Sequence, residues 1–228
     1  MNPGAKGPLQ QARRQAYRQV IVAAAERVFA ERGFEAAKIQ AIADEAGVSV
    51  GTIYGVFGSK SELFSVVLTH RLPDLLEAVH QAAMRAPTAI RKLDEGLHAF
   101  VVYMLHHPDY LQIHLREHSW GLGPTRASAE QLTAWREGLE LEAAILQDAM
   151  DEGGVVADDP QRLARCIAAV HQVQLWDWVE QGMKEAAEEV ACRIRKLVWQ
   201  MFCVVPDNSP VPGEPARGGA TKNEATLS

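Results

Sequence analysis

Two short stretches with helical periodicity, separated by three residues, constrain the fold of this chain more than any other feature. Apolar residues recur at helical spacing over 39–46 and again over 50–57, and Gly47, Val48 and Ser49 lie between the two stretches. Two apolar-faced helices joined by so short a turn predict a helix-turn-helix. In this unit the first helix lies across the DNA backbone, and the second presents its N-terminal residues to base edges in the major groove.

The rest of the sequence also predicts helices and shows no sustained alternation of strand type. A stripe over 17–28 predicts a first helix that ends at Gly33 in the left-handed C′ position. Residues 59–62, Ser-Lys-Ser-Glu, have the form of a capping box and begin a fourth helix. Further helices are expected to begin near Pro87, Pro108, Pro124 and Pro160, with a last one from about 182 to 204. The predicted fold class is all-α, with about nine helices.

Composition divides the chain into an arm, two domains and a tail. Residues 1–13 are expected to be a flexible N-terminal arm and 14–67 a three-helix DNA-binding domain built around the helix-turn-helix. A second helical domain is expected over 68–204. Residues 205–228 are rich in Pro, Gly, Ser and Asn with almost no apolar residues, which predicts a disordered tail.

Charge is unevenly distributed along the chain. The net charge is −6, but residues 1–72 hold nine Lys and Arg against six Asp and Glu, whereas the remainder holds fourteen against twenty-three. The first part is therefore +3 and the rest −9. This asymmetry indicates a nucleic-acid surface near the N-terminus and an acidic body that faces elsewhere.

Several function classes are excluded by what the sequence lacks. It has no apolar run long enough to span a membrane and no secretory segment, so a cytoplasmic protein with no membrane partner is expected. Cys166, Cys192 and Cys203 form no CxxC pair, which argues against disulfides and a zinc site and for reduced core thiols. No phosphate loop, nucleophile motif or HExxH is present, so neither an enzyme nor a cofactor is expected.

The residues around the predicted turn match a known family in register. Gly33-Phe34, Ile39, Ile42-Ala43 and the run AGVSVGTIYGVFGSKSELF at 46–64 resemble the DNA-binding signature of the tetracycline-repressor (TetR) family. The resemblance covers roughly residues 14–67. Beyond them it extends only to the number of helices and the positions of the glycines and prolines that separate them. It implies a DNA-binding transcriptional repressor that binds a palindromic operator as a homodimer and is released by a small-molecule inducer. Residues 68–204 would then be the ligand-binding and dimerisation domain.

The resemblance also assigns roles to single residues. Lys60 and Tyr54 match phosphate-contacting positions, Ser49 would cap the recognition helix, and Thr52 would contact backbone or base. The full set expected to face DNA is Lys38, Gln40, Ser49, Val50, Gly51, Thr52, Tyr54, Gly55 and Lys60. The structural alternatives are ordinary packing for Tyr54 and a solvated surface charge for Lys60.

Two departures from the family pattern concern the reading face. Ala37 and Lys38 stand where relatives have Thr or Ser, so the cap of the second helix is expected to be lost and a charge gained. Gly55 and Val56 stand where relatives carry polar or aromatic groups, and a glycine within a helix costs ~1 kcal/mol against alanine. With Val50 and Gly51 nearest the bases, the face is sparse, and specificity is expected to depend on DNA shape as well as direct contacts.

Three arginines near the start of the first helix are a further candidate contact. Arg13, Arg14 and Arg18 are expected to reach phosphates or an adjacent minor groove, with a merely soluble arm as the alternative.

The last two helices are expected to form the homodimer contact. By resemblance they pair with their symmetry mates as a four-helix bundle, an isologous interface. The residues expected in it are Leu163, Ile167, Val170, Gln174, Val190, Ile194, Leu197, Val198 and Met201. The alternative is a monomer that buries both faces in its own core.

The central helices carry a mixed aromatic and polar set that favours a mostly apolar small molecule. The residues expected around it are Tyr103, Met104, Tyr110, His114, Trp120, Trp135, His171 and Trp176, with plain core packing as the alternative for each. A metal site is one interpretation of the histidines at 106, 107, 114 and 118. A structural role for these histidines is the preferred interpretation, and no metal is expected. A second hypothesis for the whole chain is a helical small-molecule-binding or metal-binding protein that has lost specific DNA binding.

Overall fold

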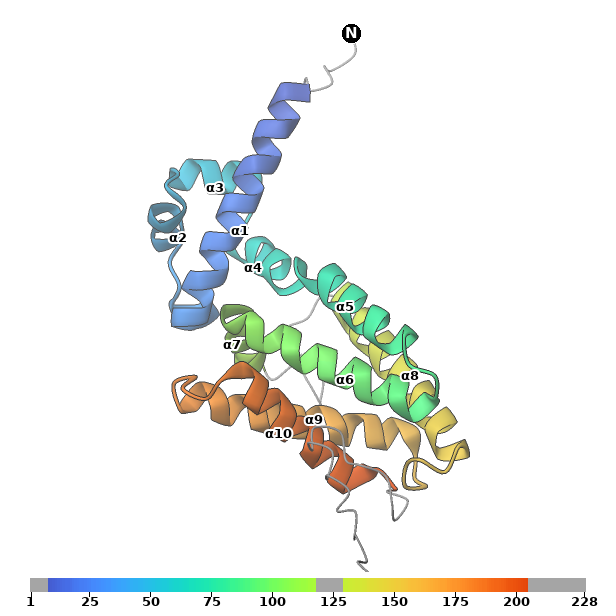
Figure 1. Ribbon diagram of the computed structural model, residues 1–228. Coiled ribbons are helices and arrows are strands. Elements are labelled where there is room, and N and C mark those ends of the chain that lie inside the picture. The colour runs from blue at the N-terminus through green and yellow to red at the C-terminus, as the bar shows by residue number, and fades with distance from the viewer. Residues whose placement is uncertain (1–7, 118–128, 205–228) are drawn as a thin grey trace, which may run out of the picture.

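The computed structural model describes residues 8–117 and 129–204, which are arranged in ten helices (Figure 1). The helices are α1 (Pro8–Ala36), α2 (Ile39–Ala46), α3 (Val50–Val56), α4 (Lys60–Thr69), α5 (Leu72–Met84), α6 (Ala89–His106), α7 (Pro108–Arg116), α8 (Ala129–Asp151), α9 (Pro160–Glu180) and α10 (Ala187–Phe202). No strand occurs among these residues, apart from one isolated bridge between Val155 and Cys203. The all-α prediction is confirmed.

The N-terminal domain, which we call the head, consists of α1 to α4 around one apolar cluster. Phe29 of α1 packs on Phe64 of α4 at a ring distance of 4.9 Å, and Phe57 and Leu63 are fully buried beside them. Burial of these large side chains is the main force that holds three short helices against α1. The N-terminal end of α1 projects past α3, as Figure 1 shows.

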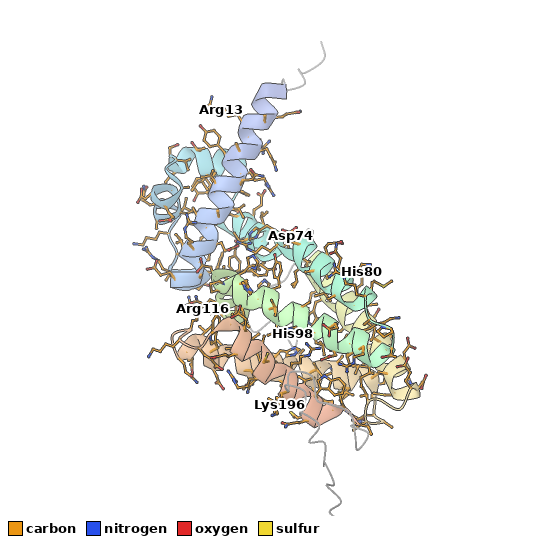
Figure 2. The ribbon with its side chains drawn as sticks, viewed as in Figure 1. Arg13, Asp74, His80, His98, Arg116 and Lys196 are labelled. Atoms are coloured by element: carbon orange, nitrogen blue, oxygen red, sulfur yellow. The ribbon has the colours of Figure 1, made fainter. Side chains whose placement is uncertain are left out.

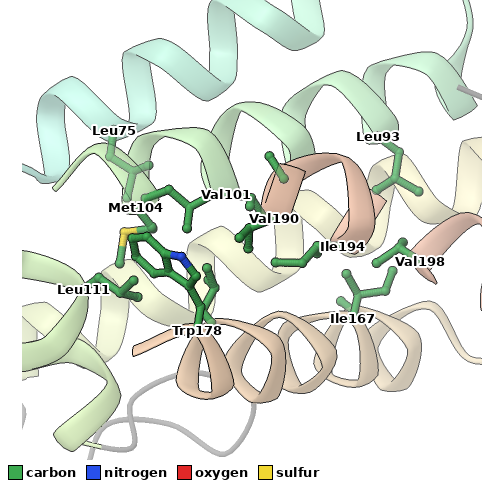
Figure 3. Packing of buried hydrophobic residues seen from close by; sticks show 14 of the residues in the cluster. Leu75, Leu93, Val101, Met104, Leu111, Ile167, Trp178, Val190, Ile194 and Val198 are labelled. Carbon is green, nitrogen blue, oxygen red and sulfur yellow. The ribbon is translucent and has the colours of Figure 1, made fainter. Parts of the chain in front are cut away.

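The second domain, the body, consists of α5 to α10 around a separate cluster. Helix α6 packs against α5, α8 and α10, so it forms the centre of the body. Figure 3 shows Met104 of α6 beside Trp178 of α9, and Val198 of α10 beside Ile167 of α9. The described apolar core thus falls into two clusters, one formed by residues 21–67 together with Ile113 and one formed by residues 75–198.

Helices α5 and α1 differ from the prediction. Helix α5 was not predicted. Pro73 lies at N1 or N2 of this helix, where proline lacks only a donor that has no partner there. Helix α1 begins at Pro8, so residues 8–13 are helical and only 1–7 of the expected arm remain outside the described residues. The start expected at Pro124 and the tail at 205–228 also lie outside them.

The first helix also ends differently from the prediction. Gly33 has the expected positive φ of 73°, but its ψ of 168° is not left-handed helical, and helical hydrogen bonding resumes to Ala36. The amide of Ala37 donates to the Gly33 carbonyl at 3.2 Å, so Gly33 forms a kink and not a simple C′ residue.

Candidate DNA-binding surface and interdomain joint

The turn between α2 and α3 has the predicted geometry. Gly47 ends α2 in the left-handed conformation (φ 64°, ψ 33°), and the Val48 amide donates to the Ala43 carbonyl at 3.0 Å. Ser49 Oγ accepts from the Thr52 amide at 3.0 Å and lies 2.8 Å from Thr52 Oγ1. This cap satisfies an orphan donor of the first turn of α3 and fixes the start of the helix.

The outward side of α3 carries few large side chains, as expected. Gly51, Gly55 and Tyr54 are exposed, Tyr54 by half of its surface, while Val50 is only partly buried. A Cβ at Gly55 would meet nothing within 4 Å, so this glycine leaves open space on the surface. Val56, in contrast, is buried in the head and does not belong to the reading face. Sequence periodicity did not separate these two neighbours.

The N-terminal ends of α2 and α4 flank this face with basic residues. Lys38 is exposed and makes no side-chain cap to α2, as predicted, and exposed Gln40 donates to Asp44 at 2.8 Å. Ser59 caps α4 by accepting from the Glu62 amide at 3.0 Å. The Glu62 carboxylate accepts from the Gly58 amide at 2.8 Å, one residue earlier than in a standard capping box.

Lys60, the predicted phosphate contact, is folded back onto the head. Its Nζ donates to the Glu35 carbonyl at 3.3 Å and lies 4.6 Å from the centre of the Phe34 ring. Both contacts are weak enough to be exchanged for a phosphate, because the group stays partly exposed.

The arginines of α1 lie at the C-terminal end of the recognition helix. Arg14 Nη2 donates to the Val56 carbonyl at 3.4 Å, and the Arg18 guanidinium lies 4.9 Å from the Phe57 ring centre. Cations are favourable next to a helix C-terminus. Arg13 is fully on the surface and lies over Tyr17 at 5.5 Å (Figure 2).

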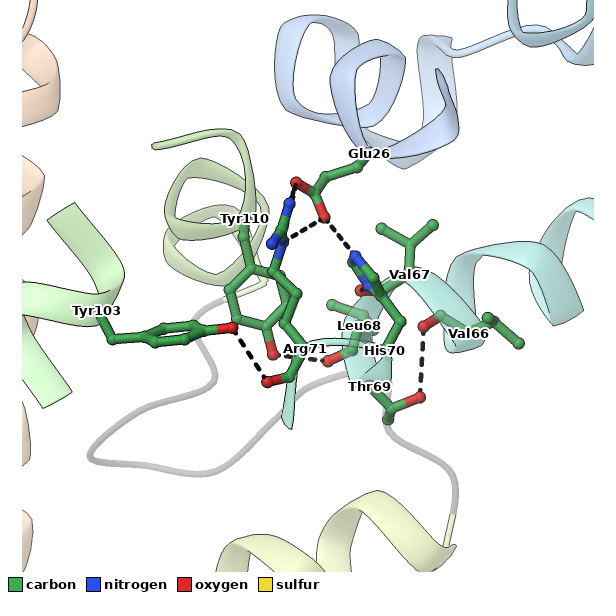
Figure 4. Close-up of polar contacts among 9 residues, drawn as sticks. All are labelled: Glu26, Val66, Val67, Leu68, Thr69, His70, Arg71, Tyr103 and Tyr110. Atoms are coloured by element: carbon green, nitrogen blue, oxygen red, sulfur yellow. Dashed lines mark hydrogen bonds and ion pairs between the residues drawn. The ribbon is translucent and has the colours of Figure 1, made fainter. Parts of the chain in front are cut away.

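Head and body meet at a polar joint that the sequence analysis missed. Glu26 of α1 is 5% exposed, yet its carboxylate accepts two hydrogen bonds from Arg71 at 2.9 Å and a weaker one at 3.2 Å. His70 Nε2 lies 2.7 Å from the same carboxylate (Figure 4). Burial alone raises the pKa of Glu26, but the hydrogen bonds from His70 and Arg71 outweigh it and lower that pKa to about 2.

Three residues predicted to contact a ligand belong to this joint instead. The Tyr110 hydroxyl donates to the Leu68 carbonyl at 3.1 Å and the Tyr103 hydroxyl to the Arg71 carbonyl at 3.3 Å, as Figure 4 shows. The His114 ring packs edge-on against Tyr110 at 4.2 Å. Burial lowers the pKa of His114 to about 4, so the ring is neutral at pH 7. No sequence signal pairs residues 26, 70, 103 and 110, because they are far apart along the chain.

The other predicted ligand residues do not converge on one cavity. Met104 and His171 are 2% and 3% exposed in the body core, Trp135 lies half-buried on α8, and Trp176 is on the exposed side of α9. Trp120 lies outside the described residues. The structure therefore does not gather these side chains around one cavity, and their contact with a ligand stays a prediction.

A small pocket does lie between α6, α9 and α10, at a different place. It is lined by His98 and Leu97 of α6, His171 of α9 and Trp199 of α10, among others, and Figure 2 labels His98. Its wall includes a buried cluster in which Asp94 accepts from Arg195 Nε at 2.8 Å and from Trp199 Nε1 at 2.6 Å. His171 is thus the one member of the predicted ligand set that borders this pocket.

The predicted dimer residues divide into two groups. Five of them, Leu163, Ile167, Val190, Ile194 and Val198, are at most 5% exposed and lie in the core of their own chain. The prediction that they face a partner is wrong, because α9 and α10 turn this stripe toward α6 and α8. Val170 and Leu197 are half-buried, Met201 is 50% exposed, and Gln174 accepts a hydrogen bond from Arg193.

No three metal-ligating side chains are grouped within the described residues, and no described helix is long and apolar enough to cross a membrane. His106 and His107 each place Nδ1 at 2.8 Å from a backbone carbonyl of α6. His118 lies outside the described residues.

Comparison with known proteins agrees with this architecture. Residues 21–67 match the model of the bacterial regulatory proteins of the tetR family. Over 88 residues the chain is 38% identical to the HTH-type transcriptional activator FasR of Mycolicibacterium smegmatis, and the match covers 39% of this chain. A regulatory protein of the tetR family from Rhodococcus RHA1 is similar with a TM-score of 0.68 at 20% identity, over 83% of this chain and 98% of that one. FadR from Bacillus subtilis, solved in complex with stearoyl-CoA, has a TM-score of 0.63 at 20% identity, over 79% and 96%.

The fold and the head thus define a helix-turn-helix protein with an all-helical body. Residues 21–67, within the head, match the bacterial regulatory proteins of the tetR family, and the fold is similar to that of the Rhodococcus RHA1 protein. Its match with FasR spans 40% of the length of FasR.

Proposed function

We propose that this chain is a transcriptional regulator that binds a palindromic site on double-stranded DNA as a homodimer and represses until a small molecule releases it. The observation that carries the proposal is the head, where a capped helix α3 presents an outward side with little side-chain bulk. Gly51 and Gly55 let the backbone approach base edges closely, and exposed Tyr54 lies where it can contact a phosphate.

Basic groups around this face support the same surface. Lys38 and Lys60 lie at the N-terminal ends of the helices on either side, where phosphates are also favoured by free backbone amides. Arg14 and Arg18 extend the positive charge to the far end of α3. The acidic body would be repelled by DNA, which favours docking through the head.

For the homodimer, the exposed side of α9 replaces the buried stripe that was first expected. Ala169, Val173 and Trp176 share one helical face, and Val173 is 57% exposed. Met201 of α10 is 50% exposed and extends the apolar surface. A second copy of this chain is the proposed occupant, because two-fold pairing would place two heads on the two halves of a palindrome.

The ligand is proposed to be a small, mostly apolar molecule bound in the body. The support is the fold, which this chain shares with FadR, a protein solved with stearoyl-CoA. Stearoyl-CoA is therefore the first probe to test for release of DNA. Release should be reciprocal, so DNA should weaken binding of the probe by the same factor.

A salt series on the DNA upstream of the gene tests the function. Binding of the full chain would be measured by fluorescence anisotropy against an unrelated sequence of equal length. We expect Lys60→Ala to weaken binding to both DNAs and to reduce the salt slope by roughly 1, since one phosphate contact is lost. Lys196→Ala, which removes an exposed lysine of α10, is the matched control and should change neither quantity.

Two outcomes would contradict the proposal at different levels. An unchanged slope in Lys60→Ala would remove Lys60 from the contacts. Equal affinity of the unaltered chain for the upstream and the unrelated DNA would favour the second hypothesis, a helical ligand-binding protein without specific DNA binding.

A further inference from the structure

The contact between head and body combines two interactions of different kinds. The first is mainly apolar: Ile113 of α7 is 2% exposed within the cluster of the head. One long hydrogen bond, from Arg116 Nη2 to the Glu31 carbonyl at 3.4 Å, accompanies it. The second is the charged group of Glu26, His70 and Arg71, which we call the latch. Apolar burial is non-directional, and the hydrogen bond of Arg116 is a single long one, so the first contact fixes the rotation of the head less firmly than the latch does.

The latch is directional. Arg71 donates to both carboxylate oxygens of Glu26 through Nε and Nη2. Such a bidentate pair fixes the relative orientation of the guanidinium and carboxylate planes as well as the distance between the two groups. His70 approaches the same carboxylate through Nε2, while its Nδ1 donates to the Val67 carbonyl at 2.7 Å. The carboxylate is thus held from two sides by consecutive residues that connect α4 to α5.

The same short segment is also held from the body. Tyr110 of α7 donates to the carbonyl of Leu68, and Tyr103 of α6 donates to the carbonyl of Arg71 (Figure 4). Residues 68–71 therefore lie between α1 of the head and two helices of the body, with a directional bond to each. A buried ion pair contributes little net stability, but it can specify one geometry among several of similar energy.

We propose that the latch holds the head at one orientation relative to the body and so sets the half-site spacing that the dimer reads. This inference rests on the proposed function. Because the body carries the dimer contact and α3 lies at the far side of the head, a small rotation at residues 68–71 displaces α3 along the DNA. Glu26 is thus a positioning residue, and it does not itself face the DNA.

The experiment compares DNA affinities over a series of half-site spacings. A palindromic site is first selected from random DNA with the unaltered full chain, and versions with one base pair removed or added at its centre are then made. Affinities are measured for Glu26→Gln, Tyr103→Phe and a matched control, Arg27→Ala. The control breaks the exposed Arg27–Glu45 pair at 2.7 Å, which lies wholly within the head.

The latch predicts a specific pattern across these variants. In Glu26→Gln the affinity for a single half-site should stay unchanged, whereas the preference for the selected spacing should fall about fivefold or more, as for a usual coupling between sites. Tyr103→Phe should show a smaller loss in the same direction, because it removes one hydrogen bond on the body side. Arg27→Ala should retain the full preference.

The remaining outcomes contradict either the role of the latch or the proposed function. Unchanged spacing preference in both Glu26→Gln and Tyr103→Phe would overturn the role of the latch, as would an equal loss in Arg27→Ala or a lack of spacing preference in the unaltered chain. If Glu26→Gln loses half-site affinity or folds poorly by circular dichroism, the role of the latch is judged from the spacing preference of Tyr103→Phe alone. Failure of the unaltered chain to select any site would overturn the proposed function, and the latch role with it.

Discussion

At the scale of single residues, one carboxyl group of the body has a buried oxygen atom without a hydrogen-bond partner among the described residues. Glu142 projects from the inward side of α8, one turn from Leu139 and Leu146 of the body core. Its Oε1 atom is fully buried and has no hydrogen-bond partner in the described part of the chain. Burial raises the pKa of Glu142 to about 8, because a lone carboxylate is poorly solvated there. Glu142 should therefore be mostly neutral at pH 7.

This predicts an unusual dependence of stability on pH. The folded state keeps the proton up to about pH 8, whereas the unfolded chain releases it near pH 4.5, so the free energy of unfolding should fall as pH rises between these values. Glu142→Gln removes the titration and should be more stable than the unaltered chain at pH 9, by on the order of a few kcal/mol, with the difference vanishing near pH 4. Thermal unfolding at several pH values measures this. Glu140→Gln, on the exposed side of the same helix, should show no such trend.

At the scale of elements, the end of α8 and the end of α10 are tied together. The Val204 amide donates to the Gly154 carbonyl and the Val156 amide to the Phe202 carbonyl, each at 3.0 Å, around the Val155–Cys203 bridge. A Cβ on Gly154 would lie 2.8 Å from Cδ1 and 3.1 Å from Cβ of Ile90. The absence of a side chain at Gly154 therefore lets this loop pack on α6.

Two glycine substitutions should consequently have opposite effects. Gly154→Ala should destabilise the body by roughly 1–3 kcal/mol, because Ile90 has to move in a packed site. Gly138→Ala, on the exposed side of α8 with nothing within 4 Å of the added Cβ, should stabilise by up to about 1 kcal/mol. Urea unfolding of both variants provides the measurement, and a neutral Gly154→Ala would show that the loop relaxes freely.

At the scale of the whole molecule, the basic head and the acidic body lie at opposite ends of one chain (Figure 1). The body exposes a face of α9 with Ala169, Val173 and Trp176, and pairing of two copies there would leave both heads free. This arrangement links oligomeric state to DNA binding, because one head alone contacts only half of a palindrome.

A charge on this face should weaken the proposed dimer. Val173→Glu should raise the dimer dissociation constant about 30-fold or more, as expected for an unpaired charge at the centre of an apolar interface. Sedimentation velocity measures the shift. Leu76→Glu, which places a charge on another exposed apolar position on α5, is the control. If both variants sediment like the unaltered chain, α9 is not the contact.

The sequence by itself determined the local features of this protein, because they depend on residues within about four positions of each other. The left-handed Gly47, the cap from Ser49 to Thr52 and the cap from Ser59 to Glu62 are all contacts of this kind. Together they specify the helix-turn-helix and its exposed face. Helical periodicity likewise predicted the all-α class, although it did not anticipate α5 behind Pro73.

Only the tertiary structure decided which faces are turned inward and which distant residues meet. Periodicity identifies an apolar stripe on α9 but not whether Leu163 and Ile167 contact their own core or a partner, since both surroundings are equally apolar. The latch joins Glu26 to Arg71, 45 residues away, and Tyr103 and Tyr110 reach the same segment from 32 and 42 residues away. Their pairing follows from the packing of α1, α6 and α7 around one joint, for which no local pattern exists.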